Sequence, residues 1–296
     1  MVEELAPGLP ANWLNGWLAA VGITVVARGT RLRWSREPSP LAILESPSQT
    51  PLAEQIAAGL PDEKTLKSLV LADKGLPRKP TLADFHRAAN EARLKGDDSL
   101  AMSLTDLVTE RKTDGSGLQH VQHGPFDPPV PRGVTLVERV IACRQFLEPD
   151  PVQRIRETLA GAGERVRTNG LGFDIRRLPS GVQADAPVMV DPVVECLCFV
   201  ALRLFPVRGD GRQQLQRGWA SGASQPGAFC WPVWSDPSDV WGIDALLDRL
   251  YSSHTRGERT DLQLYGVFGV FESVPYKPTG QSDVTRGYGA RTRRVI

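Results

Sequence analysis

Two histidines are the residues in this chain whose types and spacing come nearest to a metal site. His120 and His123 lie three residues apart in a segment rich in glycine and proline, with Asp114 and Asp127 close by. Imidazole and carboxylate ligands of this kind would suit a metal-dependent hydrolase. A zinc site takes about four ligands, and neither a cysteine nor a third histidine is near. The sequence therefore favours a loop whose histidines bind the backbone or a partner, and we expect no metal and no other cofactor.

The cysteines form a second candidate set, of which Cys196 and Cys198 are the closest pair. Two positions along a helix are about 200° apart around its axis, so these two sulfurs diverge. We expect Cys143, Cys196, Cys198 and Cys230 to be reduced core residues of a cytoplasmic protein. The start of the chain lacks the basic and apolar pattern of a secretory signal, and no segment is apolar enough to span a membrane. Phosphate-binding, zinc-protease and nucleophile-elbow motifs do not occur, so we expect no enzyme.

Arginine points to a binding function more clearly than the histidines or cysteines do, because it replaces lysine almost completely in the C-terminal half. Guanidinium groups bind phosphates through paired hydrogen bonds. The formal net charge is only +1, so a nucleic-acid surface would need local segregation of arginines. The residues that we expect to contact nucleic acid are Arg176, Arg177, Arg208, Arg212, Arg217, Arg291, Arg293 and Arg294. The alternative is an ordinary solvated surface in a protein from a GC-rich coding background.

Tryptophans supply a third set, with two opposed interpretations. Tryptophan is enriched at the hot spots of protein interfaces, so these side chains would serve as anchors for a partner protein. They would equally fit an ordinary core. The residues concerned are Trp13, Trp17, Trp219, Trp231, Trp234 and Trp241.

One apolar segment, 191–205, is the element around which we expect the C-terminal part to be organised. Asp191 suits a helix cap, Pro192 suits the first helical position, and Pro206 cannot continue the helix. Apolar residues occur on every side of this helix, which in a globular chain predicts burial all round. We therefore expect Leu197→Asp to abolish soluble folded protein.

Nearer the N-terminus we expect a helix over 13–21, capped by Asn12 and ended by Gly22. Strands over 23–26 and 31–34 follow around a turn, and 41–44 reads as one more strand. Three apolar stripes predict packing helices between 51 and 110, the last two over 82–94 and 100–108.

Later elements are expected as helices over 134–146, 150–160 and 240–251, and as strands over 171–178, 181–190, 228–234 and 262–274. The fold class is thus α+β, with mixed helices and short antiparallel sheets. A helix followed by a turn of Arg-Gly type occurs near 27 and near 208, so the chain is a candidate for two related helix-plus-hairpin halves. We expect domains over 1–111 and 132–296, joined by a linker or loop over 112–131.

Several of these segments resemble proteins of the type I-G (formerly I-U) CRISPR systems. They are the segments 14–22, 171–178, 204–209 and 216–219, together with Asp191-Pro192-Val193-Val194-Glu195 and Trp231-Pro232-Val233-Trp234. The resemblance does not identify the subunit. It implies a non-catalytic, cytoplasmic subunit of an antiviral effector complex, which contacts guide RNA, target DNA or both and other subunits. The alternative within the same system is a protein adaptor that docks the helicase-nuclease.

Overall fold

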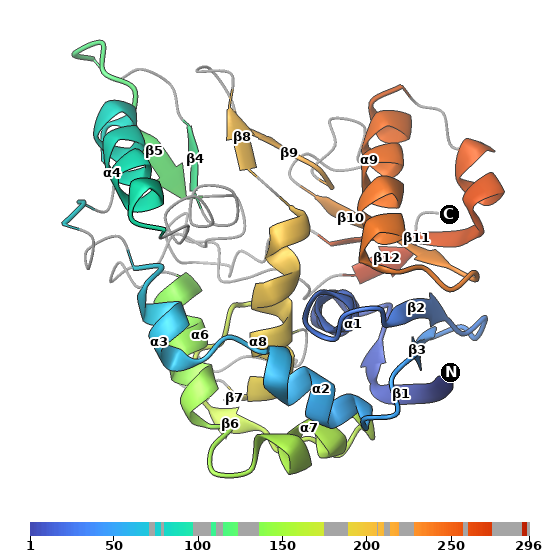
Figure 1. Ribbon diagram of the computed structural model, residues 1–296. Helices are drawn as coiled ribbons and strands as arrows, with labels where there is room; N and C mark the ends of the chain where they lie inside the picture. Colours follow the sequence, from blue (N-terminus) through green and yellow to red (C-terminus); the bar gives the residue numbers. More distant parts are fainter. Residues whose placement is uncertain are drawn as a thin grey trace, which may run out of the picture.

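The computed structural model describes residues 1–70, 75–77, 80–96, 108–110, 115–123, 136–174, 189–205, 207–209, 214–218, 228–256, 260–273 and 292–294. Helix α8 lies at its centre, with α1 and two small antiparallel sheets on one side and a group of shorter helices on the other (Figure 1). The prediction of an α+β fold with short antiparallel sheets is confirmed.

Helix α8 (Pro192–Ala201) is the enclosed segment that the sequence predicts. The Asp191 carboxylate accepts hydrogen bonds from the backbone N–H groups of Val193, at 3.0 Å, and Val194, at 3.4 Å. All residues of α8 are buried, Glu195 included, and the short 3-10 helix η3 (Leu202–Leu204) continues it. The predicted cap and all-round burial are therefore confirmed.

Helix α1 (Leu14–Val26) packs along α8 and is longer than predicted. A Cβ atom at Gly22 would lie 2.1 Å from the carbonyl oxygen of Leu197 in α8. Gly22 thus allows the two helices to approach each other closely, and the prediction that it ends the helix is wrong. Residues 23–26, which we expected to form a strand, are the last turn of α1. Asn12 is not the cap either, because its amide oxygen accepts a hydrogen bond from the Ser39 hydroxyl.

The N-terminal sheet has the strand order β1-β3-β2, with all pairs antiparallel. Its strands are β1 (Val2–Pro10), β2 (Arg31–Trp34) and β3 (Leu41–Ser46). In β2 the buried residues Leu32 and Trp34 alternate with arginines, as predicted. The sequence gives little sign of β1, because its proline and glycine residues disfavour strands.

The C-terminal sheet consists of β10 (Phe229–Trp234), β11 (Val267–Ser273) and β12 (Thr292–Arg294) in that order. All residues of β10 are buried. The prediction of a strand or bent strand pair over 262–274, split by Gly266 and Gly269, is partly wrong. Thr260–Tyr265 forms a 3-10 helix, η4, and β11 begins after Gly266.

Tryptophan side chains join this sheet to the N-terminal part. The indole N–H of Trp17 donates to the backbone oxygen of Pro232, and that of Trp231 donates to the oxygen of Ala11, both at 2.8 Å. Trp234 donates to the oxygen of Leu32, also at 2.8 Å. These bonds between residues far apart in sequence fix β10 against α1 and the N-terminal sheet.

Shorter helices cover the other side of α8. They are α2 (Leu52–Gly59), α3 (Glu63–Lys67), α6 (Leu136–Gln145) and α7 (Pro151–Leu159). Contacts link α6 to α8 and to α3, and α7 to α2. Helices α6 and α7 confirm the predictions for 134–146 and 150–160. None of the helices in the described part of the chain combines the length and the apolar character that crossing a bilayer requires.

Helix α9 (Val240–Arg256) confirms and extends the helix predicted over 240–251. The residues predicted to align on its inner face, Ile243, Leu246, Leu247 and Leu250, are all buried. The helix therefore packs one apolar face inward and leaves the rest of its surface open to other contacts.

Helix α4 (Leu82–Leu94) has a small core of its own around Phe85 and Ala89. Leu94, which the predicted stripe includes, is 89% exposed, so the stripe ends before it. Most of the stripe predicted over 100–108 lies outside the described residues, and Val108 belongs to a strand rather than to a helix.

Three two-stranded pairs complete the fold. They are β4 (Val108–Glu110) with β5 (Val121–His123), β6 (Val166–Arg167) with β7 (Met189–Val190), and β8 (Val207–Gly209) with β9 (Gln214–Gln216). The strand predicted over 171–178 is wrong for residues 171–174, which form no strand, and the remainder lies outside the described residues. Strand β7 lies at the end of the strand predicted over 181–190, and its partner is β6.

A helix is followed by an antiparallel strand pair twice, since β2 and β3 follow α1, and β8 and β9 follow α8. The first pair is not the hairpin predicted around Arg28-Gly29, because residues 23–26 belong to α1. That the two halves are related stays a prediction. One buried cluster joins residues from both sides of segment 112–131, from Ala6 to Phe271. The domain boundaries at 111 and 132 stay predictions. The parts that flank them share this core.

Candidate functional site

The two histidines occupy a strand pair beside α4. His120 forms an isolated antiparallel bridge with Thr81, and His123 ends β5. Asp114 and Asp127 lie outside the described residues. Within the described ranges, no group of three or more histidine, cysteine, aspartate or glutamate side chains is arranged to hold a metal ion.

All four cysteines are buried and free, as predicted for core residues. Burial raises the pKa of the Cys196 thiol to about 12 and raises the pKa of Cys198 well above its ordinary value. The Cys198 thiol also donates to the backbone oxygen of Asn15, at 3.2 Å. Since the thiolate is the reactive form, these groups suit packing rather than nucleophilic chemistry.

Buried acidic groups around α8 are used to hold neighbouring segments. Asp191 accepts a hydrogen bond from the Thr158 hydroxyl at 2.8 Å, in addition to capping the helix. Glu195 accepts from the backbone N–H of Leu171. These contacts fix α7 and the segment before β7 against α8, and they explain why a helix without a wet face carries two carboxylates.

The predicted nucleic-acid contacts fall into three groups. Arg176, Arg177, Arg212 and Arg291 lie outside the described residues. Arg208 lies on β8, and Arg293 and Arg294 lie on β12, so these three belong to two different sheets.

Arg217, which follows β9, is the one predicted residue whose side chain is described. Its guanidinium donates to Asp244, and to the Asp248 carboxylate at 3.1 Å, both on α9. Its side chain is only 12% exposed. The structure therefore uses Arg217 to hold the turn after β9 against α9.

Many other arginines are paired within the chain in the same way. Ion pairs with aspartate or glutamate are formed by Arg33, Arg87, Arg144, Arg154, Arg156 and Arg165. Most of these pairs are partly exposed, so each contributes little stability. Their effect on the surface is larger, because each pair removes a free positive charge from it.

The tryptophans divide between core and surface. Trp17, Trp231 and Trp234 are fully buried, so the interpretation of these three as partner anchors is wrong. Trp13 is half-buried and Trp219 lies outside the described residues. Trp241, near the start of α9, is 76% exposed.

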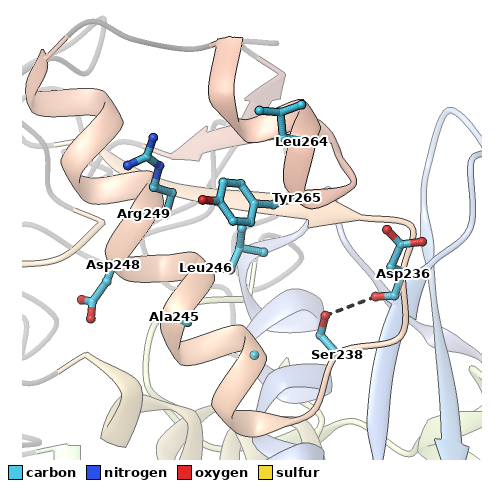
Figure 2. A pocket seen from close by; sticks show the side chains of 9 residues that line it. Asp236, Ser238, Ala245, Leu246, Asp248, Arg249, Leu264 and Tyr265 are labelled. Atoms are coloured by element: carbon cyan, nitrogen blue, oxygen red, sulfur yellow. Dashed lines mark hydrogen bonds between the residues drawn. The ribbon is translucent and has the colours of Figure 1, made fainter.

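Trp241 lies near an open groove between α9 and η4. The groove has a volume of about 640 Å³. Figure 2 shows Tyr265 above Leu246 and directed toward Arg249, with Leu264 further along η4 and Asp236 at the opposite side. The lining residues are Asp236, Ser238, Gly242, Ala245, Leu246, Asp248, Arg249, Leu264 and Tyr265. The central guanidinium carbon of Arg249 lies 5.9 Å from the centre of the Tyr265 ring.

The sequence did not reveal this groove. Leu264 and Tyr265 fall in the segment expected to be a strand, where half of the side chains would be buried. In the 3-10 helix they are 84% and 52% exposed. The one sequence signal of a bend here is Gly266, which follows η4 and has φ +73°, but it does not indicate a groove. A glycine inside an apolar run often marks a bend of this kind.

Comparison of the chain with models of protein families, with curated proteins and with solved structures finds no match.

Proposed function

We propose that this chain is a non-catalytic subunit of a type I-G CRISPR effector complex, whose task is to bind other components. It acts in the cytoplasm, in keeping with four free cysteines that stay reduced. Its partners are the other effector subunits and the nucleic acid that they hold.

This proposal is supported by where the segments that resemble type I-G proteins lie in the fold. Helix α1, the start of α8 and the Trp231–Trp234 part of β10 are far apart in sequence but pack against one another. Segments that together form one core are what a shared fold requires.

Contact with nucleic acid would come from those of the predicted arginines that lie on strands. Arg293 and Arg294 are the first to test, since they lie at the C-terminal edge strand. We expect double replacement by glutamine to weaken binding of the assembled complex to guide RNA or target DNA. The slope of log affinity against log salt should fall by about one for each phosphate contact removed.

Arg154→Gln is the matched control for this experiment. Arg154 forms an exposed pair with Glu164, at 2.7 Å, so its charge is already compensated. Binding measured by electrophoretic shift over a range of salt concentrations should change little in this variant. An affinity that does not depend on salt, or an equal loss in the control, would contradict nucleic-acid contact through the C-terminal edge strand.

A second candidate function, an adaptor that docks the helicase-nuclease, is favoured by a separate observation. Trp241, Leu264 and Tyr265 expose large apolar surface beside one groove. The pairing of Arg217 with α9 also reduces the positive surface in this region. Co-purification with one partner subunit that survives nuclease treatment and high salt would support the adaptor, and dissociation under either treatment would count against it.

A further inference from the structure

We propose that the groove between α9 and η4 is the docking site for a segment of a partner protein that carries apolar side chains flanked by lysine or arginine. This inference deepens the proposed binding function, since it gives the surface and the chemistry of one partner. It does not depend on whether the chain also contacts nucleic acid.

Exposed apolar side chains provide the first part of the argument. Among the described residues, three of the most exposed large apolar side chains, Trp241, Leu264 and Tyr265, belong to the two elements that form the groove. Trp241 shares a helix stripe with Ala245 and Asp248, which line the groove, because positions four and seven residues on return to the same face. Leu264 and Tyr265 line the groove itself, and Trp241 adds exposed apolar surface next in sequence to the lining residue Gly242. Grouped apolar exposure of this kind marks a protein contact.

The floor of the groove leaves room for side chains. Leu246 is buried beneath it, while Gly242 and Ala245 give the flank of α9 little bulk. The Asp236 carboxylate lies close to Gly266, since a Cβ atom built there would come within 2.5 Å of it. A partner side chain that enters the groove would therefore meet an apolar floor and a carboxylate at one wall.

Charge decides the kind of partner. The stretch 236–249 contains four aspartates and one arginine, in a chain whose net charge is +1. Asp236 and Asp248 line the groove and both are exposed. Among the described residues, no donor lies within hydrogen-bond distance of the Asp236 carboxylate, while Asp248 is shared with Arg217. A lysine or arginine of the partner would complement this rim.

The lining charges also bear on the other occupants. Phosphate groups of RNA or DNA would meet two carboxylates, Asp236 and Asp248, and one lining cation, Arg249, which already faces the Tyr265 ring. A second copy bound through the same face would present the same mixture of charges. A protein segment with basic and apolar side chains would cover the exposed apolar side chains of the groove and would also pair with the carboxylates at its rim.

A direct test uses two labelled amphipathic peptides and the full-length protein. The first carries leucines along one helical face with lysines on both flanks, and the second has glutamate in place of each lysine. We expect saturable binding of the lysine peptide and none of the glutamate peptide, followed by fluorescence anisotropy. Trp241→Ala and Leu264→Ala should each weaken binding about tenfold, as expected for hot-spot residues. Asp236→Asn should weaken it and reduce its dependence on salt.

Leu94→Ala is the matched control, because Leu94 is 89% exposed on α4. Its affinity for the lysine peptide should equal that of the unchanged protein, and all variants should keep the same melting temperature. Equal binding by the Trp241→Ala protein, absence of saturable binding, competition by an RNA oligonucleotide, or a dimer that Trp241→Ala dissociates would each overturn the proposal. The proposed complex membership fails separately, if the chain does not associate with guide RNA or effector subunits.

Discussion

At the scale of single residues, the thiols and the carboxylates around α8, which are groups capable of chemistry, are buried. The cysteine thiols, Asp191 and Glu195 all lie in the core around α8, where they pack, cap the helix or fix a loop. The α9 side chains that line the groove include Asp248 and Arg249 beside apolar residues. Buried reactive groups and an exposed contact surface are what we would expect of a binding subunit.

The thiols give a prediction at this scale. In the native protein we expect none of the four cysteines to react with a thiol reagent at neutral pH. Burial blocks access to all four, and it raises the pKa of Cys143, Cys196 and Cys198. All four should react after denaturation. The number of modified groups can be counted by mass spectrometry. Rapid modification of Cys196 in folded protein would show that α8 is not enclosed.

Residue patterns identified the cap and burial of α8 because those signals are local. Asp191, Pro192 and an unbroken apolar run suffice to predict them. The end of α1 was predicted wrongly because a glycine at position 22 fits two structures. It can end a helix, or it can let a second helix pack closely against the first. Only the position of Leu197, far along the chain, distinguishes between them.

At the scale of elements, the close approach of α1 and α8 leads to a second prediction. We expect Gly22→Ala to destabilise the protein by about 1–3 kcal/mol, because the added methyl group forces the helices apart. The measurement is the free energy of unfolding in urea. The matched control is Gly242→Ala on α9, where the nearest atom to the added carbon is the Cβ of Ser238 at 3.4 Å.

Gly242→Ala should be neutral or stabilise the protein by up to about 1 kcal/mol, since alanine favours helix more than glycine does. If the two substitutions had equal effects, the close packing of α1 on α8 would not be a feature of the folded protein.

Element boundaries also show why the groove could not be predicted. Periodicity marks 262–274 as apolar, but it does not separate a short helix from a strand. Formation of η4 depends on Gly266 and on the backbone bond from Ser235 N–H to the Gly266 oxygen, at 3.0 Å. The exposed pair Leu264 and Tyr265 follows from that bend, and so does the groove.

At the scale of the whole molecule, one core joins the N-terminal and C-terminal parts. The third prediction is that Leu197→Asp abolishes soluble folded protein, because Leu197 is 0% exposed and a carboxylate there would be buried in the core. Leu94→Asp is the control, and it should melt like the unchanged protein. Yield of soluble protein and thermal melting report both outcomes. A cooperatively melting Leu197→Asp protein would refute the central position of α8.

The account as a whole is tested most directly by native mass spectrometry of the full-length chain, purified under mild conditions from the organism that carries it. We predict assemblies in which the chain has a fixed stoichiometry with other effector subunits and a guide RNA. A chain recovered alone, free of RNA and of those subunits, or one that turns over a substrate by itself, would contradict the proposed role.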